Sequence, residues 1–309
     1  MLKTVKATPV WKFNFLKKKG GDESKFTLFD YFVVAFFIFV LLITFIPLWY
    51  VVVVSFTPLE LTKTSGYNLF LPPTQWSLAA YQQLLSQNQI VQSLVNSVIL
   101  TVSSVAVNMV LTTLTAYGLI YKNLPGRNLL LTLFLFTFLF NAGLIPTYLV
   151  VKNLNLLDNY LAIILPTAIS VYNMLVMKAF FQGIPTSLSE SAIVDGANEL
   201  QILWHIILPL SKPILLTIGL FYAVTTWNDF FNPILYLSNN DLMPLPVVLR
   251  GILLSTNMND YVQENALFTA PQDALKMAAV ILTTLPMLFL YPWIQRYFTK
   301  GVLVGSVKE

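Results

Sequence analysis

The stretch YFVVAFFIFVLLITFIPLWYVVVV (residues 31–54) contains no charged residue. A helix that crosses the hydrocarbon core of a bilayer needs about 20 mostly apolar residues, so this stretch is long enough to span a membrane. Five further segments also qualify. The sequence therefore predicts an all-α, polytopic membrane protein with six transmembrane helices, at 29–54, 94–120, 129–151, 160–181, 213–236 and 274–294.

The composition supports a membrane protein and excludes several other classes. Of 309 residues, 56% are hydrophobic and only 10% are charged, against about 25% charged residues in a soluble domain. Cysteine is absent and His205 is the single histidine, so we expect no metal site and no catalytic thiolate. The first apolar run is long and has no small-residue cleavage site, which argues against a secretory signal peptide.

The distribution of Lys and Arg predicts the orientation. With the amino terminus in the cytoplasm, fourteen of the 18 basic residues fall on the inner side of the six predicted helices, as the positive-inside rule requires. We therefore expect both termini to be cytoplasmic. The net charge of +4 then reflects topology and contact with anionic lipid, and we expect no nucleic-acid partner.

This topology divides the chain into three parts. A basic cytoplasmic segment (1–28) precedes a transmembrane domain (29–294), and a cytoplasmic tail (295–309) follows it. Residues 187–208 form a polar insert on the inner side, and residues 237–273 form an extracellular loop. The sequence WKFNFLKKK (11–19) could lie in the lipid headgroup zone or serve only as a basic topogenic segment.

The insert has the pattern of a helix–turn–helix. Ser187 and Glu190 have the spacing of a capping box, which predicts a helix start at about residue 188. Gly196 permits the turn that follows, because glycine adopts backbone conformations that other residues resist. Asn198 and Gln201 repeat the capping pattern and predict a second helix.

The second predicted helix of the insert carries one apolar stripe. Leu200, Leu203, Trp204 and Ile207 lie at helical spacing, so we expect this stripe to pack against the membrane domain. Pro209 and Pro213 should break the helix before the fifth span. The small side chains of the first helix suit close docking of another protein.

The same residues are similar to the EAA signature of ABC importer permeases. The match consists of Glu190-Ser191-Ala192, Gly196 after three residues, and Ile206-x-Leu208-Pro209 after nine more. Ser191 replaces the usual alanine. The resemblance implies a type I ABC importer permease fold, in which this segment is the coupling helix that contacts a separate ATPase through Glu190, Ser191, Ala192, Asp195, Gly196, Ala197, Ile206, Leu208 and Pro209.

Other segments resemble the carbohydrate-uptake, maltose-importer-like branch, and a subgroup of it that imports complex oligosaccharides in Gram-positive bacteria. These are WNDFFNP (227–233), YFTKGVLVGSVKE (297–309) and the stretches 143–166 and 270–292. The resemblance implies an oligosaccharide substrate, a second homologous permease, an ABC ATPase dimer and an extracellular solute-binding lipoprotein. The chain has no phosphate-binding P-loop, so ATP and Mg²⁺ are expected on the partner ATPase and the chain itself is expected to be non-catalytic.

Polar residues in the fifth predicted span are candidates for the substrate path. Thr225, Asn228, Asp229 and Asn232 have the spacing of one helical face, with Trp227 nearby. A buried acid in a bilayer is costly, so Asp229 should face the protein or a water-filled path. Amide, hydroxyl and carboxylate groups bind sugar hydroxyls, but they can equally hold helices together.

Two other polar sets favour helix packing. The second span contains five polar residues at near-helical spacing, namely Ser97, Thr101, Ser104, Asn108 and Thr115. The fourth span contains Pro166, Ser170 and Asn173, which suggest a kink.

The sequence leaves two alternative functions open, a secondary ion-coupled transporter and an ABC permease for a non-sugar solute. A secondary transporter would be expected to carry coupling acids or paired broken helices at the midplane.

Overall fold

The computed structural model describes residues 27–255 and 270–305, and the regular structure of these residues is helical. It divides into two units, one ending at Leu48 and the other beginning at Trp49. Three predictions fall on residues outside the described ranges, wholly or in part. These are the N-terminal segment (1–28, not described before 27), the centre of the loop 237–273, and the last four residues of the tail.

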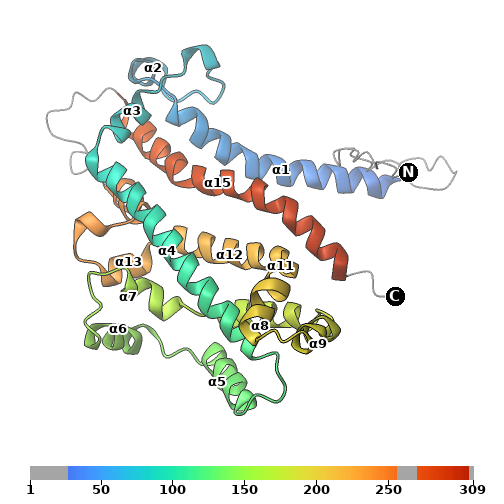
Figure 1. Ribbon diagram of the computed structural model, residues 1–309. Helices are drawn as coiled ribbons and strands as arrows, with labels where there is room; N and C mark the ends of the chain where they lie inside the picture. The colour runs from blue at the N-terminus through green and yellow to red at the C-terminus, as the bar shows by residue number, and fades with distance from the viewer. Residues whose placement is uncertain (1–26, 256–269, 306–309) are drawn as a thin grey trace. The chain divides into compact units, whose positions relative to one another are not determined.

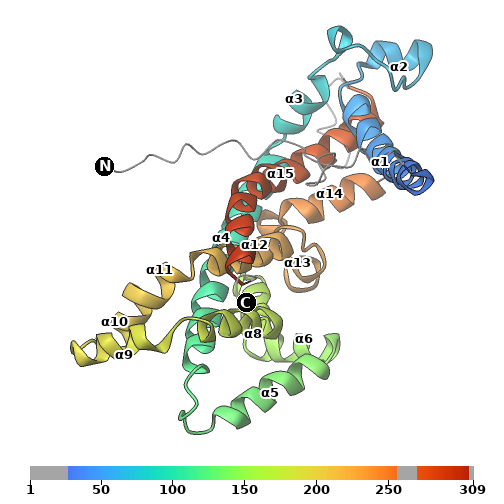
Figure 2. The same ribbon diagram turned by 90° about the vertical axis from the view of Figure 1, so that its right-hand side faces the viewer.

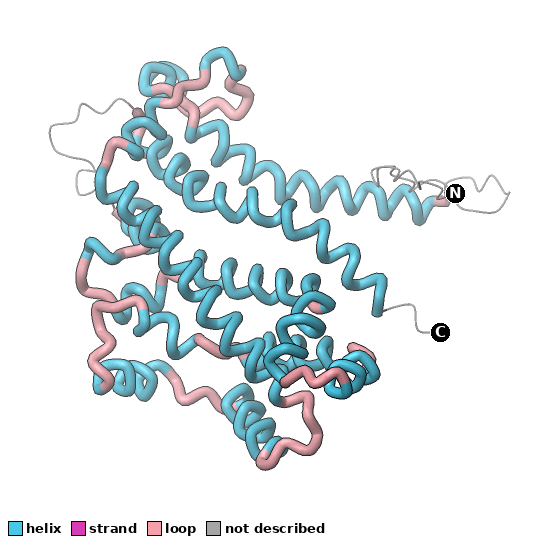
Figure 3. Tube along the Cα trace, viewed as in Figure 1, coloured by secondary structure: helices cyan, strands magenta, loops and turns pink. Residues whose placement is uncertain are grey.

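Helix α1 (Leu28–Ser55) provides the described part of the first unit and enters the second. Figures 1 and 3 show the helices of the second unit. In chain order these are α2 (Leu59–Ser65), η1 (Pro73–Gln75), α3 (Ala79–Leu85), α4 (Asn88–Gly118), α5 (Arg127–Leu139), α6 (Leu144–Asn153), α7 (Leu161–Ile164), η2 (Leu165–Thr167), α8 (Val171–Gln182), α9 (Thr186–Val194), α10 (Glu199–Ile202), η3 (Leu203–Ile207), α11 (Leu208–Leu210), α12 (Lys212–Trp227), α13 (Phe231–Tyr236), η4 (Asn240–Leu242), α14 (Leu245–Leu254) and α15 (Gln272–Gly305).

Among the described residues, three unbroken helices are long and apolar enough to cross a membrane, namely α1, α4 and residues 272–290 of α15. Three bent helix pairs also have the required length and composition, so the described residues offer up to six spans if each pair counts as one. This number agrees with the six predicted segments. Helix α15 continues to Gly305, past the predicted end at residue 294.

The third predicted span, 129–151, is not one helix. Its axis bends by 118° between α5 and α6. The break contains Gly143 at φ +88°, a conformation that favours glycine, and the Asn141 side chain accepts a hydrogen bond from the Gly143 N–H at 2.8 Å. Asn141 and Gly143 are therefore the sequence signal for this break.

The predicted kink in the fourth span is confirmed. Helices α7–η2 and α8 meet at 53°, with Pro166 inside the 3₁₀ turn η2. The Ser170 side chain caps α8 by accepting a hydrogen bond from the Asn173 N–H. Capping restores a partner to an N–H group that the broken helix leaves free.

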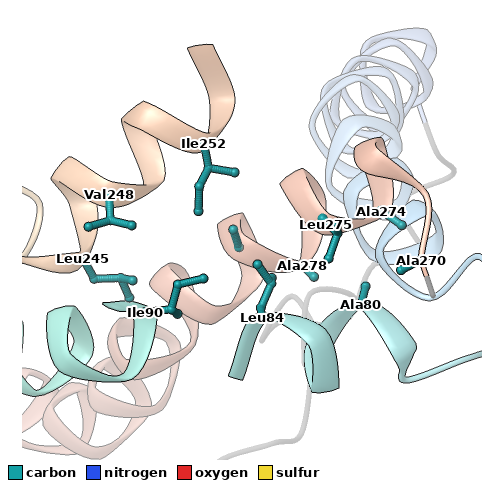
Figure 4. Close-up of a cluster of buried hydrophobic side chains, with 11 residues drawn as sticks. Ala80, Leu84, Ile90, Leu245, Val248, Ile252, Ala270, Ala274, Leu275 and Ala278 are labelled. Atoms are coloured by element: carbon teal, nitrogen blue, oxygen red, sulfur yellow. The ribbon is translucent and has the colours of Figure 1, made fainter. Parts of the chain in front are cut away.

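The described residues of the second unit form three apolar clusters, and the long helix α4 contributes to all of them. Figure 4 shows the first, in which α3, α4, α14 and α15 meet. Its alanines, including Ala274 and Ala278 of α15, allow close approach between helices. The second cluster joins the end of α4 to α8, α10, η3 and α12, and the third joins α4, α6, α7 and α13.

Buried polar side chains of α4 also join it to its neighbours. The Ser104 and Thr226 hydroxyls lie 3.0 Å apart and link α4 to α12, and the Ser97 hydroxyl accepts from the Leu245 N–H of α14 at 2.7 Å. The predicted packing role of the second-span polar residues is therefore confirmed for these two. Such hydrogen bonds are worth about 1 kcal/mol each inside a membrane domain.

Candidate functional site

The polar insert forms the helix–turn–helix that its sequence predicts. Helix α9 ends at Val194, and Gly196 follows at φ +85°. The Ala197 N–H bonds to the Ala192 carbonyl at 2.9 Å, and the Gly196 N–H bonds to the Ile193 carbonyl at 3.0 Å. This pair of bonds defines a Schellman motif with glycine at its left-handed position. Gly196 therefore fixes the angle at which the chain leaves α9.

The two predicted capping boxes have different outcomes. The Asn198–Gln201 box is confirmed, because each side chain bonds to the other's backbone N–H, at 2.8 and 2.9 Å. The Ser187–Glu190 box is wrong. Helix α9 begins at Thr186 with Pro185 as its N-cap and no side-chain cap. Ser187 is already helical, and its carbonyl accepts a hydrogen bond from the Ser191 hydroxyl.

The predicted apolar stripe of the second helix is only half right. Leu203 and Ile207 are buried, but Leu200 and Trp204 are 63% and 66% exposed. Residues 203–207 form the π-helical turn η3, in which the i and i+5 positions are paired. Consequently Ile202, and not Trp204, shares the buried face with Ile207.

The irregular turn has a cause in the sequence. Pro209 has no backbone N–H, and its ring would clash with the His205 carbonyl in a regular α-helix. The helix widens before Pro209 and then bends by 84° at Ser211, the residue before α12. The predicted break at Pro209 and Pro213 is thus confirmed, and the insert projects from one end of the helices in the second unit (Figure 2).

The nine residues of the EAA-like signature divide between two sides of the insert. Four of them pack partly buried against the cluster formed by α4, α8 and α12, namely Ala192, Ala197, Ile206 and Leu208. The other five are exposed, namely Glu190, Ser191, Asp195, Gly196 and Pro209. Five large apolar side chains of residues 187–208 are also exposed, at Leu188, Ile193, Val194, Leu200 and Trp204. His205 is exposed, with its ring nitrogen Nδ1 3.0 Å from the Gln201 carbonyl oxygen.

A cavity of about 910 Å³ lies among α4, α8, α12 and α13. Three of the five predicted path residues line it, namely Thr225, Asp229 and Asn232. Trp227 does not line this cavity: it is buried and donates its indole N–H to the Thr283 carbonyl of α15 at 2.9 Å. Asn228 is exposed and donates to the Val224 carbonyl.

The predicted helical face through Asp229 is also wrong. Helix α12 ends at Trp227, so 213–236 is not continuous. Asp229 Oδ1 accepts from the Phe231 and Asn232 N–H groups at 3.0 and 3.1 Å. Its Oδ2 accepts from the Asn232 side chain at 2.6 Å. The carboxylate therefore caps α13 while facing the cavity, and the favourable end of a helix dipole offsets part of its cost.

Tyr222 is the residue that sequence reasoning missed at this cavity. Its hydroxyl lies 2.7 Å from the Thr112 hydroxyl of α4 and accepts from the Ser170 N–H at the start of α8, at 3.0 Å. A single buried side chain on α12 thus connects three helices at the cavity wall. A tyrosine within a membrane-spanning helix is the signal that could have found it, since a buried hydroxyl needs a hydrogen-bond partner.

The remaining wall combines aliphatic side chains with polar and aromatic groups. Thr167, Asn173 and Thr226 contribute hydroxyl and amide groups, and Tyr172 and Phe221 contribute aromatic rings. The volume falls within the range of about 300–1,000 Å³ typical of small-molecule sites. A membrane-spanning helical protein with a cavity that carries several polar groups on a mostly apolar wall, and with a projecting, partly apolar insert, has the architecture of a transport permease.

The family comparison identifies which kind of permease. The profile of the binding-protein-dependent transport system inner membrane component matches residues 23–304, and the chain belongs to this family. It is 44% identical over 283 residues to the polygalacturonan/rhamnogalacturonan transport system permease protein YtcP of Bacillus subtilis strain 168, covering 91% of this chain and 98% of the relative. Protein LplC of the same strain is 43% identical over 270 residues, covering 86% and 90%.

A solved structure agrees with these relatives. A chain from the crystal structure of a bacterial ABC transporter involved in importing the acidic polysaccharide alginate superimposes with a TM-score of 0.79. It is 28% identical, and the match covers 89% of this chain and 99% of that one. The resemblance to ABC importer permeases of the carbohydrate branch is therefore confirmed. The chain is a membrane-embedded transport component, and its family implies an ATPase and a solute-binding protein as partners.

Proposed function

We propose that the chain is one of two permease subunits of an ABC importer that takes up an oligosaccharide. The relatives named for polygalacturonan/rhamnogalacturonan and alginate support a fragment of an acidic polysaccharide as the substrate. A solute-binding lipoprotein delivers the sugar outside the cell. A separate ATPase dimer, which holds ATP and Mg²⁺, drives the transport cycle.

The observation that carries this proposal is the two-sided insert formed by α9, α10, η3 and α11. One side is anchored by Ile202, Leu203 and Ile207 in the cluster shared with α4, α8 and α12. The other side exposes Val194 and Trp204, at 87% and 66%. Exposed aromatic and aliphatic side chains in a polar segment are typical of a protein-docking surface. We assign this surface to the ATPase.

The connections of the insert support a lever mechanism. Helix α8 enters it and helix α12 leaves it, and both line the cavity. Closure of the ATPase dimer moves the insert. The attached helices then change the side of the membrane to which the cavity is open. A population shift of this kind requires that ATP binding favour one of two alternative packings.

The cavity is the proposed sugar path through this subunit. Asp229, Asn232 and Thr225 offer groups that bind sugar hydroxyls, and the Phe221 and Tyr172 rings offer apolar surfaces for the C–H face of a sugar ring. The second permease completes the wall. The same polar groups also stabilise helix ends, so a substitution experiment must separate the two roles.

The proposed topology follows the distribution of basic residues. Both termini and the insert lie in the cytoplasm, and residues 237–273 face outside, where they contact the solute-binding protein. Helix α14, within this outer segment, buries Leu245, Val248 and Ile252 against α15. That packing gives the outer segment a fixed base for docking.

A tagged pull-down in mild detergent tests the proposal. The tagged chain should retain a second permease and an ATPase, and the complex should hydrolyse ATP faster when its solute-binding protein carries sugar. Screening that binding protein against oligogalacturonides, rhamnogalacturonan fragments and neutral oligosaccharides identifies the substrate. A chain that retains no ATPase under conditions that preserve the permease pair would contradict the proposal.

A further inference from the structure

A polar contact joins the insert to helix α4, in addition to the apolar cluster. Glu199, the first residue of α10, places its Oε2 atom 2.8 Å from the Tyr117 hydroxyl and 2.5 Å from the Tyr121 hydroxyl. The two hydroxyl oxygens are 2.7 Å apart. Tyr117 lies in the last turn of α4 and Tyr121 just beyond it. One carboxylate oxygen therefore connects two elements that are about 80 residues apart in the chain.

The chemistry of this contact makes it directional and strong. An ionised carboxylate only accepts hydrogen bonds, and each tyrosine hydroxyl has one proton to donate. Hydrogen bonds to an ionised acceptor are roughly twice as strong as neutral ones. Burial raises the pKa of Tyr121, and the hydrogen bond to Glu199 raises it further. The Tyr121 hydroxyl therefore stays protonated, and remains a donor, throughout the physiological pH range.

The tyrosine rings hold the hydroxyls in place. Tyr117 is only 7% exposed and belongs to the cluster that also contains Ile202 and Leu203. The Tyr117 and Tyr121 rings meet edge to face, with centroids 5.4 Å apart and planes at 89°. Because packing restricts both rings, Glu199 is the more easily displaced partner, and its position follows that of α10.

Helix α4 needs such a contact because no short chain segment connects it to the insert. Helices α8 and α12 are each attached to the insert by a few residues, whereas residues 119–185 separate α4 from it. Yet α4 contributes Asn108 to the cavity wall, and its Thr112 meets Tyr222 beside the cavity. Contacts at the end of α4 therefore give movement of the insert a direct route to this part of the wall, besides the hydrogen bonds between α4 and α12.

We propose that Glu199, Tyr117 and Tyr121 form a joint that transmits movement of the insert to α4. These are positioning residues for coupling, and they leave the docking surface around Trp204 unchanged. The inference rests on the proposed docking of an ATPase to the insert. It adds that α4 follows the insert through a hydrogen-bonded contact, so that three cavity-lining helices move together.

The test uses the complete transporter reconstituted in liposomes. Glu199→Ala and the double variant Tyr117→Phe/Tyr121→Phe are compared with wild type for three quantities, namely retained ATPase subunit, ATP hydrolysis, and sugar imported per ATP hydrolysed. Glu60→Ala, an exposed acid in α2, and Tyr148→Phe, which keeps its ring stacked on Tyr236, are the matched controls.

Both joint variants should retain the ATPase and hydrolyse ATP, while sugar imported per ATP falls about tenfold, which lies within the usual range of coupling between sites. Combining Glu199→Ala with the double variant should cause no further loss, because all three changes remove the same contact. Glu199→Gln should recover much of the ratio, since its amide oxygen still accepts from one tyrosine.

Two results would contradict the proposed coupling role of this joint. One is an unchanged ratio of sugar to ATP in Glu199→Ala. The other is a parallel loss of ATPase retention, hydrolysis and uptake that Glu199→Gln does not rescue, which would indicate a purely structural contact. If Glu199→Ala does not accumulate in the membrane, the single variant Tyr121→Phe decides between these outcomes. Failure of the proposed function itself looks different, because then even the wild-type complex retains no ATPase.

Discussion

At the scale of single residues, Gly196 controls the geometry of the turn between α9 and α10. Its φ of +85° is the value that the Schellman motif requires. A Cβ added at Gly196 would meet nothing within 4 Å, so the constraint comes from the backbone conformation and not from crowding. The turn should therefore be sensitive to the type of residue even though it is exposed.

We predict that Gly196→Val uncouples transport while leaving membrane insertion intact. A β-branched side chain in the left-handed region costs about 1–2 kcal/mol, which is enough to shift the angle between α9 and α10. Uptake and expression in membranes are the measurements. Gly118→Val is the matched control, because Gly118 is in α4, also has free space around it, and lacks a positive φ. Normal uptake by Gly196→Val would show that the conformation of this turn is not required for coupling.

Asp229 provides a second test at the residue scale, since it both caps α13 and faces the cavity. Loss of the cap in Asp229→Ala should cost about 1 kcal/mol of stability. If the carboxylate also lines the sugar path, uptake should fall further than assembly does. Asn239→Ala is the control, because Asn239 caps η4 through the Asp241 N–H and is not among the cavity-lining residues. Equal losses of assembly and uptake would assign Asp229 to packing alone.

The residue-scale outcomes show which sequence signals are dependable. Gly196 and the Asn198–Gln201 box were predictable because each acts within six residues of the chain. Asp229 was assigned to a helical face because 213–236 reads as one apolar run. The sequence NDFFNP contains the signals for a break there, an Asp that caps three residues later and a Pro at 233, but a hydropathy pattern does not register them.

At the scale of elements, the segment α10–η3–α11 has one buried face and one exposed face. Leu203 is 2% exposed, and its neighbour Trp204 is 66% exposed. Periodicity at 3.6 residues placed both on one face, which the π turn contradicts. A π turn is difficult to predict from sequence because its cause, Pro209, is equally compatible with a simple helix end.

We predict opposite effects for these two neighbours. Leu203→Ala should destabilise the permease by about 2–5 kcal/mol, as expected for a buried leucine, and should be visible as a lower melting temperature in detergent. Trp204→Ala should change stability by no more than about 0.5 kcal/mol, yet weaken ATPase binding by about 2 kcal/mol. Full ATPase retention by Trp204→Ala would place the docking surface elsewhere on the insert.

At the scale of the whole molecule, the apolar segments were the most predictable feature. Each segment must present apolar side chains to the lipid over the thickness of the bilayer, so its composition alone locates it in the sequence. The breaks between α5 and α6 and within the fifth span have local signals, at Asn141 and Gly143 and at Asp229, but the angle of each bend is set by how the helices pack, and packing is a tertiary property. The α4–α12 hydrogen bonds join residues that are more than 100 positions apart. The spacing of polar residues therefore predicted that α4 would pack through hydrogen bonds, but it did not predict which residues of α12 they would bond to.

The central claim is that an ATPase acting through α9 and α10 drives this permease. The most direct measurement is sugar uptake into liposomes that contain the purified permeases and ATPase, with sugar-loaded binding protein outside. We predict that uptake requires ATP on the side of the insert and continues when proton and sodium gradients are abolished. Uptake driven by either gradient in liposomes that lack the ATPase would contradict the claim.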